Sequence, residues 1–82
     1  MLFLDIKHDV QASKVLIDGD FIILKLTNGL ELKFSKHLNK RLAGASSDQL
    51  KKVELICDGT GLHWDELDED LSVSGILDGR FG

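Results

Sequence analysis

The sequence predicts an α+β fold, with a small antiparallel sheet built on a β-meander and short helices packed on one face. Two dipeptides that favour tight hairpin turns, Asp18-Gly19 and Asn28-Gly29, separate three apolar runs. The apolar spacing then changes from two residues to four, which indicates short helices before a second group of strands. A chain of 82 residues supports one small core, so residues 1–82 are expected to form a single domain.

The meander is predicted from the amino-terminal half of the chain. Residues 2–7 are expected to add a strand beside it. Residues 20–27 predict a central strand, because apolar side chains fall on both of its faces. Residues 30–34 alternate instead, which is typical of a half-exposed strand with three side chains toward the core: Leu30, Leu32 and Phe34.

Two helical segments are predicted next. Residues 36–43 are expected to form a short helix with Ser35 as N-cap, Leu38 and Leu42 on its apolar face, and Gly44 at its end. Ser46, followed three residues later by Gln49, matches a capping box and predicts a second helical turn.

The remaining residues predict a second pair of strands and a last helix. Residues 53–57 alternate, with Val53, Leu55 and Cys57 expected to face inward. A turn at 58–61 leads to a short partner strand that directs Leu62 and Trp64 inward. Ser72 is expected to cap a helix that Gly79 closes.

Composition limits the location and the class of protein. No apolar run approaches the roughly 18 residues of a membrane span. The amino terminus carries Asp5 early and lacks the basic lead of a signal peptide. A single cysteine, Cys57, cannot form an internal disulfide. A soluble, cytoplasmic protein without a membrane partner is therefore expected.

The charges are separated along the chain. Residues 33–52 hold six basic side chains and one acidic side chain, a net charge of +5, whereas residues 58–70 hold six acids and no base, a net charge of −6. Either the acidic segment folds against the basic segment, or each faces a different partner.

No catalytic, cofactor or metal site is predicted. The possible metal ligands His8, His37, His63 and Cys57 are scattered without a recognised ligand spacing. The acidic run does not fit a calcium loop, because Leu67 and Leu71 occupy intervening positions. A general acid needs shielding from water, and so exposed a run does not favour an enzyme.

Residues 41–77 resemble a known family. The motifs "RLAGASSDQ", "ELICDGTGLHW", "LDEDLSV" and "GIL" are similar to those of domain-of-unknown-function family 2442, and "HW-x-x-LDEDLSV-x-G" is a specific combination. Asp65 stands where many relatives have proline, and "KHLNK" stands where they carry aromatic residues. The resemblance implies no established activity. It implies small bacterial proteins that are often encoded beside another small protein, in a manner suggestive of toxin–antitoxin pairs.

These observations favour a non-enzymatic regulatory or antitoxin-like protein that binds a small protein encoded nearby. The expected binding segment is the acidic loop 65–70 with the preceding histidine: His63, Asp65, Glu66, Asp68, Glu69 and Asp70. The alternatives are an enzyme of unknown type and a nucleic-acid-associated module that uses the exposed face of the basic helix, namely Lys36, Lys40 and Arg41. Direct contact with nucleic acid is not expected, since the chain is acidic overall, and the oligomeric state stays open.

Overall fold

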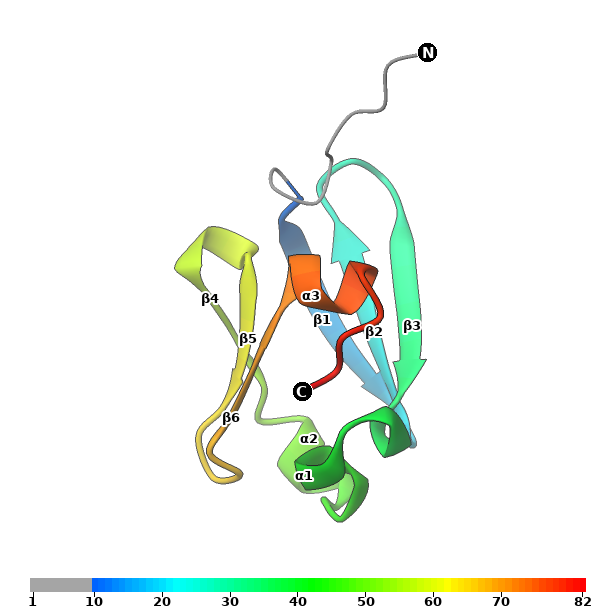
Figure 1. Ribbon diagram of the computed structural model, residues 1–82, viewed down its shortest axis with the longest axis vertical. Coiled ribbons are helices and arrows are strands. Elements are labelled where there is room, and N and C mark those ends of the chain that lie inside the picture. Colours follow the sequence, from blue (N-terminus) through cyan, green and yellow to red (C-terminus); the bar gives the residue numbers. More distant parts are fainter. Residues whose placement is uncertain (1–9) are drawn as a thin grey trace.

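The computed structural model describes residues 10–82 and confirms the α+β class. The strands form two antiparallel sheets of three strands each, joined by short helices (Figure 1). The strand predicted at residues 2–7 lies outside the described residues. No helix within residues 10–82 has the length and apolarity of a membrane span.

The first sheet is the predicted meander. It consists of β1 (Ala12–Asp18), β2 (Phe21–Leu26) and β3 (Glu31–Ser35), in that order. In the central strand, Ile22 and Leu24 are completely buried. The first turn is centred on Gly19 and Asp20, and because only Gly19 has a positive φ, it is not the expected type I′ turn. Leu30 precedes β3 and is 55% exposed, so its predicted core position was wrong.

The predicted helix at 36–43 is divided into two pieces. A 3-10 turn, η2 (Lys36–Leu38), is capped by Ser35, and helix α1 (Lys40–Ala43) starts anew after Asn39, whose backbone is extended. The break directs Leu38 into solvent, contrary to its predicted core position, while Leu42 is buried as expected.

Helix α2 (Ser47–Leu50) follows directly. It carries the predicted capping box, because the Ser46 side chain accepts from the Gln49 N–H and the Gln49 side chain accepts from the Ser46 N–H. The box satisfies two N–H groups that a short helix leaves unpaired at its start.

The second sheet consists of β4 (Glu54–Ile56), β5 (Gly61–Trp64) and β6 (Glu69–Ser72). Leu62 and Trp64 are buried as predicted, and the Trp64 indole N–H donates to the Leu50 carbonyl over 3.1 Å. The predicted inward position of Cys57 was wrong. The strand ends one residue earlier, and Cys57 begins the 3-10 turn η3 (Cys57–Gly59) with a positive φ and an exposed side chain.

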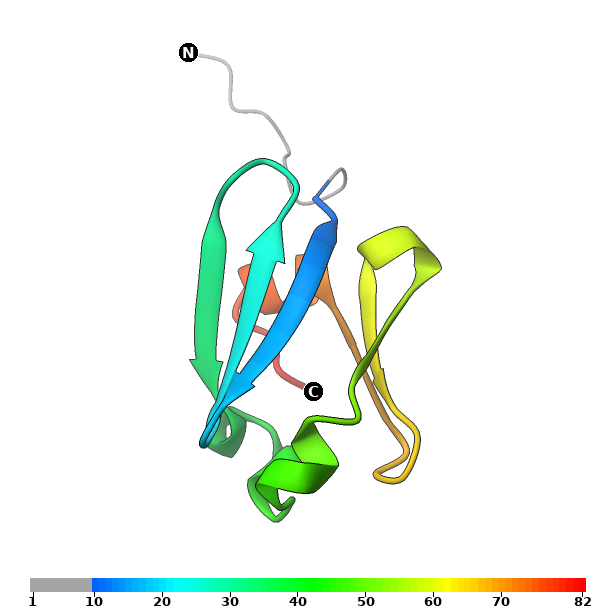
Figure 2. The ribbon, with the colours of Figure 1, turned by 180° about the vertical axis from the view of Figure 1, so that it is seen from behind.

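The last helix, α3 (Val73–Leu77), begins at Ser72 as predicted, since the Ser72 hydroxyl accepts from the Gly75 N–H over 2.9 Å. Figures 1 and 2 place α3 on one side of the first sheet, and no described helix covers the opposite side of that sheet. Residues from both sheets and from the helices share one core, including Leu24, Leu62 and Ile76.

The turn η3 lies against β1 of the first sheet at Gly59. A Cβ atom at this position would overlap the backbone carbonyl oxygen of Ala12 in β1. Gly59 also has a φ of +86°, a conformation that side chains disfavour. The turn between β4 and β5 therefore needs glycine for two separate reasons.

We expect Gly59→Ala to lower the free energy of unfolding by more than about 3 kcal/mol, because strain and a backbone clash act together. The matched control is Gly19→Ala. Gly19 also has a positive φ, but a Cβ atom there would meet no other atom within 4 Å. The control should lose only about 1–2 kcal/mol. Urea denaturation followed by circular dichroism measures both, and equal losses would contradict the close approach.

Candidate functional site

The acidic run forms a β-hairpin instead of the expected loop. Strands β5 and β6 pair Leu62 with Leu71 and Trp64 with Glu69, so Glu69 and Asp70 belong to a strand. Residues 65–68 form the turn, which we call the hairpin tip. The Asp68 N–H donates to the Asp65 carbonyl over 3.2 Å, and Asp68 has a φ of +51°.

Two residues of the basic segment 33–52 bind the hairpin tip. The Arg41 guanidinium donates to the backbone carbonyls of Leu67 and Asp68 over 3.2 and 3.0 Å. The Lys52 ammonium pairs with the Glu66 carboxylate, and this pairing raises the pKa of Lys52. The basic and acidic segments therefore contact each other within the fold, as the first of the two predicted arrangements requires.

Most carboxylates of the hairpin nevertheless face water. The Asp65 and Asp68 side chains are 90% and 95% exposed, and Asp70 is also exposed. Ion pairs between such exposed groups contribute roughly 0–1 kcal/mol each. The hairpin thus retains accessible negative charge although basic residues lie beside it.

Glu69 is the exception, because it is turned toward the buried Asn39. The Asn39 amide nitrogen donates to the Glu69 carboxylate over 2.7 Å and also to the Phe81 carbonyl. The Asn39 amide oxygen accepts from the N–H groups of Arg41 and Leu42, both at 2.9 Å. All four hydrogen-bonding positions of the amide are therefore occupied.

Sequence reasoning did not single out Asn39, although a signal was present. Asparagine is among the preferred N-cap residues, and here it stands directly before the apolar spacing of α1. Its contact with Glu69 spans 30 residues and had no counterpart in the local pattern.

His63 lies between two acids, Asp70 on the paired strand and Asp65 at the start of the hairpin tip. Its Nδ1 atom is hydrogen-bonded to the Asp70 carboxylate, and its Nε2 atom lies 3.4 Å from the Asp65 carboxylate. The hydrogen bond with Asp70 raises the pKa of His63 above its ordinary value of 6.5. Protonated His63 therefore offsets part of the negative charge of the hairpin.

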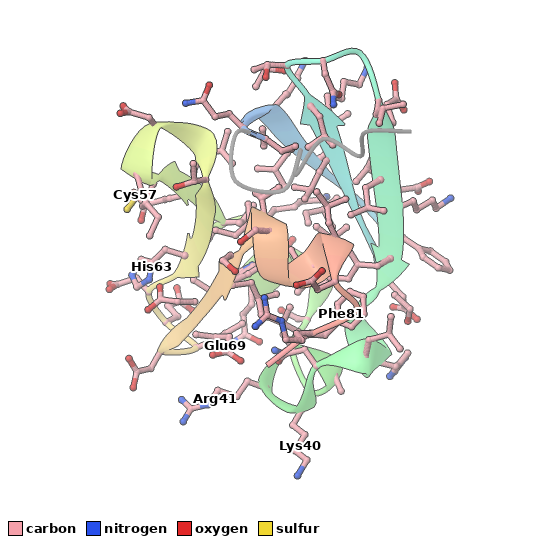
Figure 3. All side chains as sticks on the ribbon, turned by 45° about the horizontal axis from the view of Figure 1, so that its top comes forward. Lys40, Arg41, Cys57, His63, Glu69 and Phe81 are labelled. Carbon is pink, nitrogen blue, oxygen red and sulfur yellow. The ribbon has the colours of Figure 1, made fainter. Side chains whose placement is uncertain are left out.

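The three basic residues proposed for nucleic acid do not form one exposed face. Lys36 is only 14% exposed, and its ammonium donates to the Ala45 carbonyl over 2.8 Å. Arg41 extends toward the hairpin tip, whereas Lys40 projects away from the molecule (Figure 3). The predicted exposure of Lys36 was therefore wrong, and the three side chains lie in different surroundings.

Within residues 10–82, no group of three or more His, Cys, Asp or Glu side chains could hold a metal ion. His8 lies outside the described residues. Cys57 lies in the turn η3 and His63 in strand β5 (Figure 3), and among the described residues no hydrogen bond joins them.

The sequence of residues 12–82 matches the model of the family described as "Protein of unknown function (DUF2442)". The chain belongs to the DUF2442 family. No curated protein matches it.

Two solved structures are similar to this DUF2442 protein. A protein of unknown function from Rhodospirillum rubrum is 43% identical, with a TM-score of 0.83 over 89% of this chain and 90% of that chain. An uncharacterised protein from Chromobacterium violaceum is 32% identical, with a TM-score of 0.77 over 88% of this chain and 68% of that chain. The fold described above is thus shared by experimentally determined structures of other bacterial proteins.

The Asn39–Glu69 contact predicts a specific rescue. Asn39→Asp keeps the cap oxygen but sets a second carboxylate against Glu69, so it should lower the free energy of unfolding by about 2–3 kcal/mol. Adding Glu69→Gln restores a hydrogen-bond donor between the two side chains. The double variant should regain at least about 1 kcal/mol of the lost free energy of unfolding. Urea denaturation of the single and double variants completes the cycle. Strictly additive losses would show that the two side chains are not coupled.

His63 predicts a pH dependence of stability. Because its pKa is raised in the folded state, the stabilisation is fully present below the ordinary pKa of 6.5 and is lost as pH rises through the folded value. Wild type should exceed His63→Gln in melting temperature near pH 5.5–6, and the gap should close toward pH 8.5. In an NMR titration, Asp70→Asn should lower the pKa of His63. A gap that widens with rising pH would contradict the assignment.

Proposed function

We propose that this DUF2442 protein is a non-enzymatic regulatory protein that binds a basic surface of another small protein through its acidic hairpin. The contacting side chains would be Asp65, Glu66, Asp68 and Asp70. His63 would adjust the charge of this surface, whereas Glu69 would hold the hairpin in place from inside.

The observation that carries the proposal is the exposure of the tip carboxylates on a backbone that is held in place. Asp65 and Asp68 extend almost completely into water. Exposed charges of one sign steer a partner of opposite charge and increase its rate of association. A fixed scaffold reduces the entropy that such charges lose on binding.

The backbone of the tip supports the same interpretation. Asp68 adopts a left-handed conformation, which costs a residue other than glycine roughly 1–2 kcal/mol. The two Arg41 hydrogen bonds to the tip carbonyls and the buried Trp64 at the end of β5 oppose relaxation of this turn. The backbone that carries these carboxylates is therefore held in place.

An antitoxin-like role is the more specific form of the proposal. It is supported by the resemblance to a family whose members are often encoded beside another small protein. Neutralising a basic partner is a task for which an exposed acidic hairpin is chemically suited.

The proposal is tested by co-expression with the product of the adjacent gene. The tip variant combines Asp65→Asn with Asp68→Asn, and asparagine is well tolerated at the positive φ of Asp68. Affinity purification should recover at least tenfold less of the adjacent product with the tip variant than with wild type at about 0.05 M salt. The difference should shrink at about 0.3 M salt, where exposed charges are screened.

The matched control combines Asp18→Asn with Asp58→Asn. It removes the same charge at two other exposed positions, and Asp58, like Asp68, has a positive φ. The control should recover as much of the adjacent product as wild type. Equal recovery by the tip variant and wild type at both salt concentrations would remove the hairpin as the binding site.

A further inference from the structure

Among the described residues, nothing pairs with the backbone groups on the outer edge of β3. The first sheet ends at this strand, and β2 pairs with its other edge. Two hydrogen bonds fix which residues of β3 face β2. The Leu26 N–H donates to the Leu30 carbonyl, and the Lys36 N–H donates to the Asp20 carbonyl. The even-numbered residues of this segment therefore direct their backbone groups toward β2. The backbone N–H and C=O groups of Glu31 and Lys33 therefore point away from the sheet.

No described strand covers this edge. Within residues 10–82, no backbone hydrogen bond outside the β2–β3 ladder involves Glu31 or Lys33. Figures 1 and 2 both show β3 at the margin of the molecule, on the side opposite the β5–β6 hairpin. The opposite edge of the sheet differs, because β1 contacts β4 and η3.

Proteins protect exposed edges with proline, with bulges or with charged side chains. Strand β3 has neither proline nor a bulge, and its charged side chains are one acid and one base. The chain contains no proline, and the irregularity in the first sheet lies in β1, between Ala12 and Lys14. Glu31 and Lys33 have opposite charges two residues apart, and each also contacts β2: the Glu31 carboxylate lies 3.7 Å from the Lys25 ammonium, and the Lys33 ammonium lies over the Phe21 ring. Both side chains are exposed, so an antiparallel copy of this strand would still be attracted.

We propose that a second copy of this chain pairs with β3 in antiparallel orientation, on a two-fold axis that passes through Leu32. This register places Glu31 of each copy opposite Lys33 of the other. The two sheets would then join into one sheet of six strands, in which the outward backbone groups of Glu31 and Lys33 are paired.

Charge and burial both select this register. A two-fold axis through Lys33 would place two ammonium groups directly opposite each other, which is unfavourable across strands. The axis through Leu32 instead places Leu32 beside its copy and Leu30 opposite Phe34 of the second copy. Leu30, which is 55% exposed in the single chain, would lie beside the second copy, although Phe34 itself is only 5% exposed.

A second copy suits this edge better than a strand from a different protein. The opposite charges are placed symmetrically about Leu32, and this symmetry is what a two-fold interface requires. One short strand from each copy buries little surface, so the dimer belongs to the weak class of interfaces. The contact is independent of the acidic hairpin, and each dimer would carry two hairpins.

Sedimentation equilibrium of the full chain at low salt, up to about 1 mM protein, tests the proposal. Wild type should reach a dimer in this range. Glu31→Lys and Lys33→Glu should each weaken dimerisation at least tenfold, because each sets like charges opposite each other in the paired strands. Lys14→Glu in β1 reverses the same charge as Lys33→Glu on the far strand of the sheet, and it should dimerise as wild type does.

Two further arms separate the register from a general effect of charge. An equimolar mixture of the Glu31→Lys and Lys33→Glu proteins should form a heterodimer, since every cross-strand pair becomes attractive. The double variant Glu31→Lys with Lys33→Glu should recover the homodimer. Circular dichroism and melting confirm that each variant is folded. A wild-type monomer at about 1 mM, or a dimer unaffected by both single reversals, would overturn the proposal.

Discussion

The buried side chain of Asn39 joins three segments that are far apart in the sequence. Its oxygen accepts two backbone N–H groups of α1, and its nitrogen donates to Glu69 in β6 and to the Phe81 carbonyl near the carboxyl terminus. An amide supplies two acceptor sites and two donors, so this site uses its full capacity. The opposite orientation of the amide would set its nitrogen against two N–H groups and its oxygen against a carboxylate. The surroundings therefore fix one orientation, and through it the position of α1 relative to the second sheet.

This contact explains how a dense acidic run is accommodated in so small a domain. Glu69 is paired inside, and Glu66 is paired with Lys52, so these two acids help to hold the hairpin. Asp65 and Asp68 extend into water, where the high dielectric constant weakens their repulsion. The internal pairing weighed from the charge pattern is thus present at Glu66 and Glu69, while Asp65 and Asp68 stay exposed.

Local signals in the sequence predicted the elements that depend on neighbouring residues. The Ser46–Gln49 capping box and the Ser72 cap involve residues only three apart, and both were confirmed. The inward position predicted for Cys57 was wrong because the chain turns early and brings Gly59 against Ala12. The alternation of apolar residues along a strand does not encode such a long-range contact. The core position predicted for Leu38 was wrong because Asn39 divides the expected helix. At the candidate site, composition predicted where the acids gather, but the inward position of Glu69 required a partner 30 residues away.

The positions of the charged residues relative to the strands separate two regions of the molecule. At the hairpin, several negatively charged carboxylates lie close together. Exposed charges interact over about 10 Å at 0.1 M salt, so two copies of this region would repel each other. At the edge of β3, one acid and one base alternate along the strand, and this order would favour the proposed antiparallel pairing with a second copy. Because the two regions lie on opposite sides of the molecule, pairing at the strand edge would leave both hairpins accessible (Figure 1). Association of like chains and recognition of a basic partner are therefore compatible in this fold.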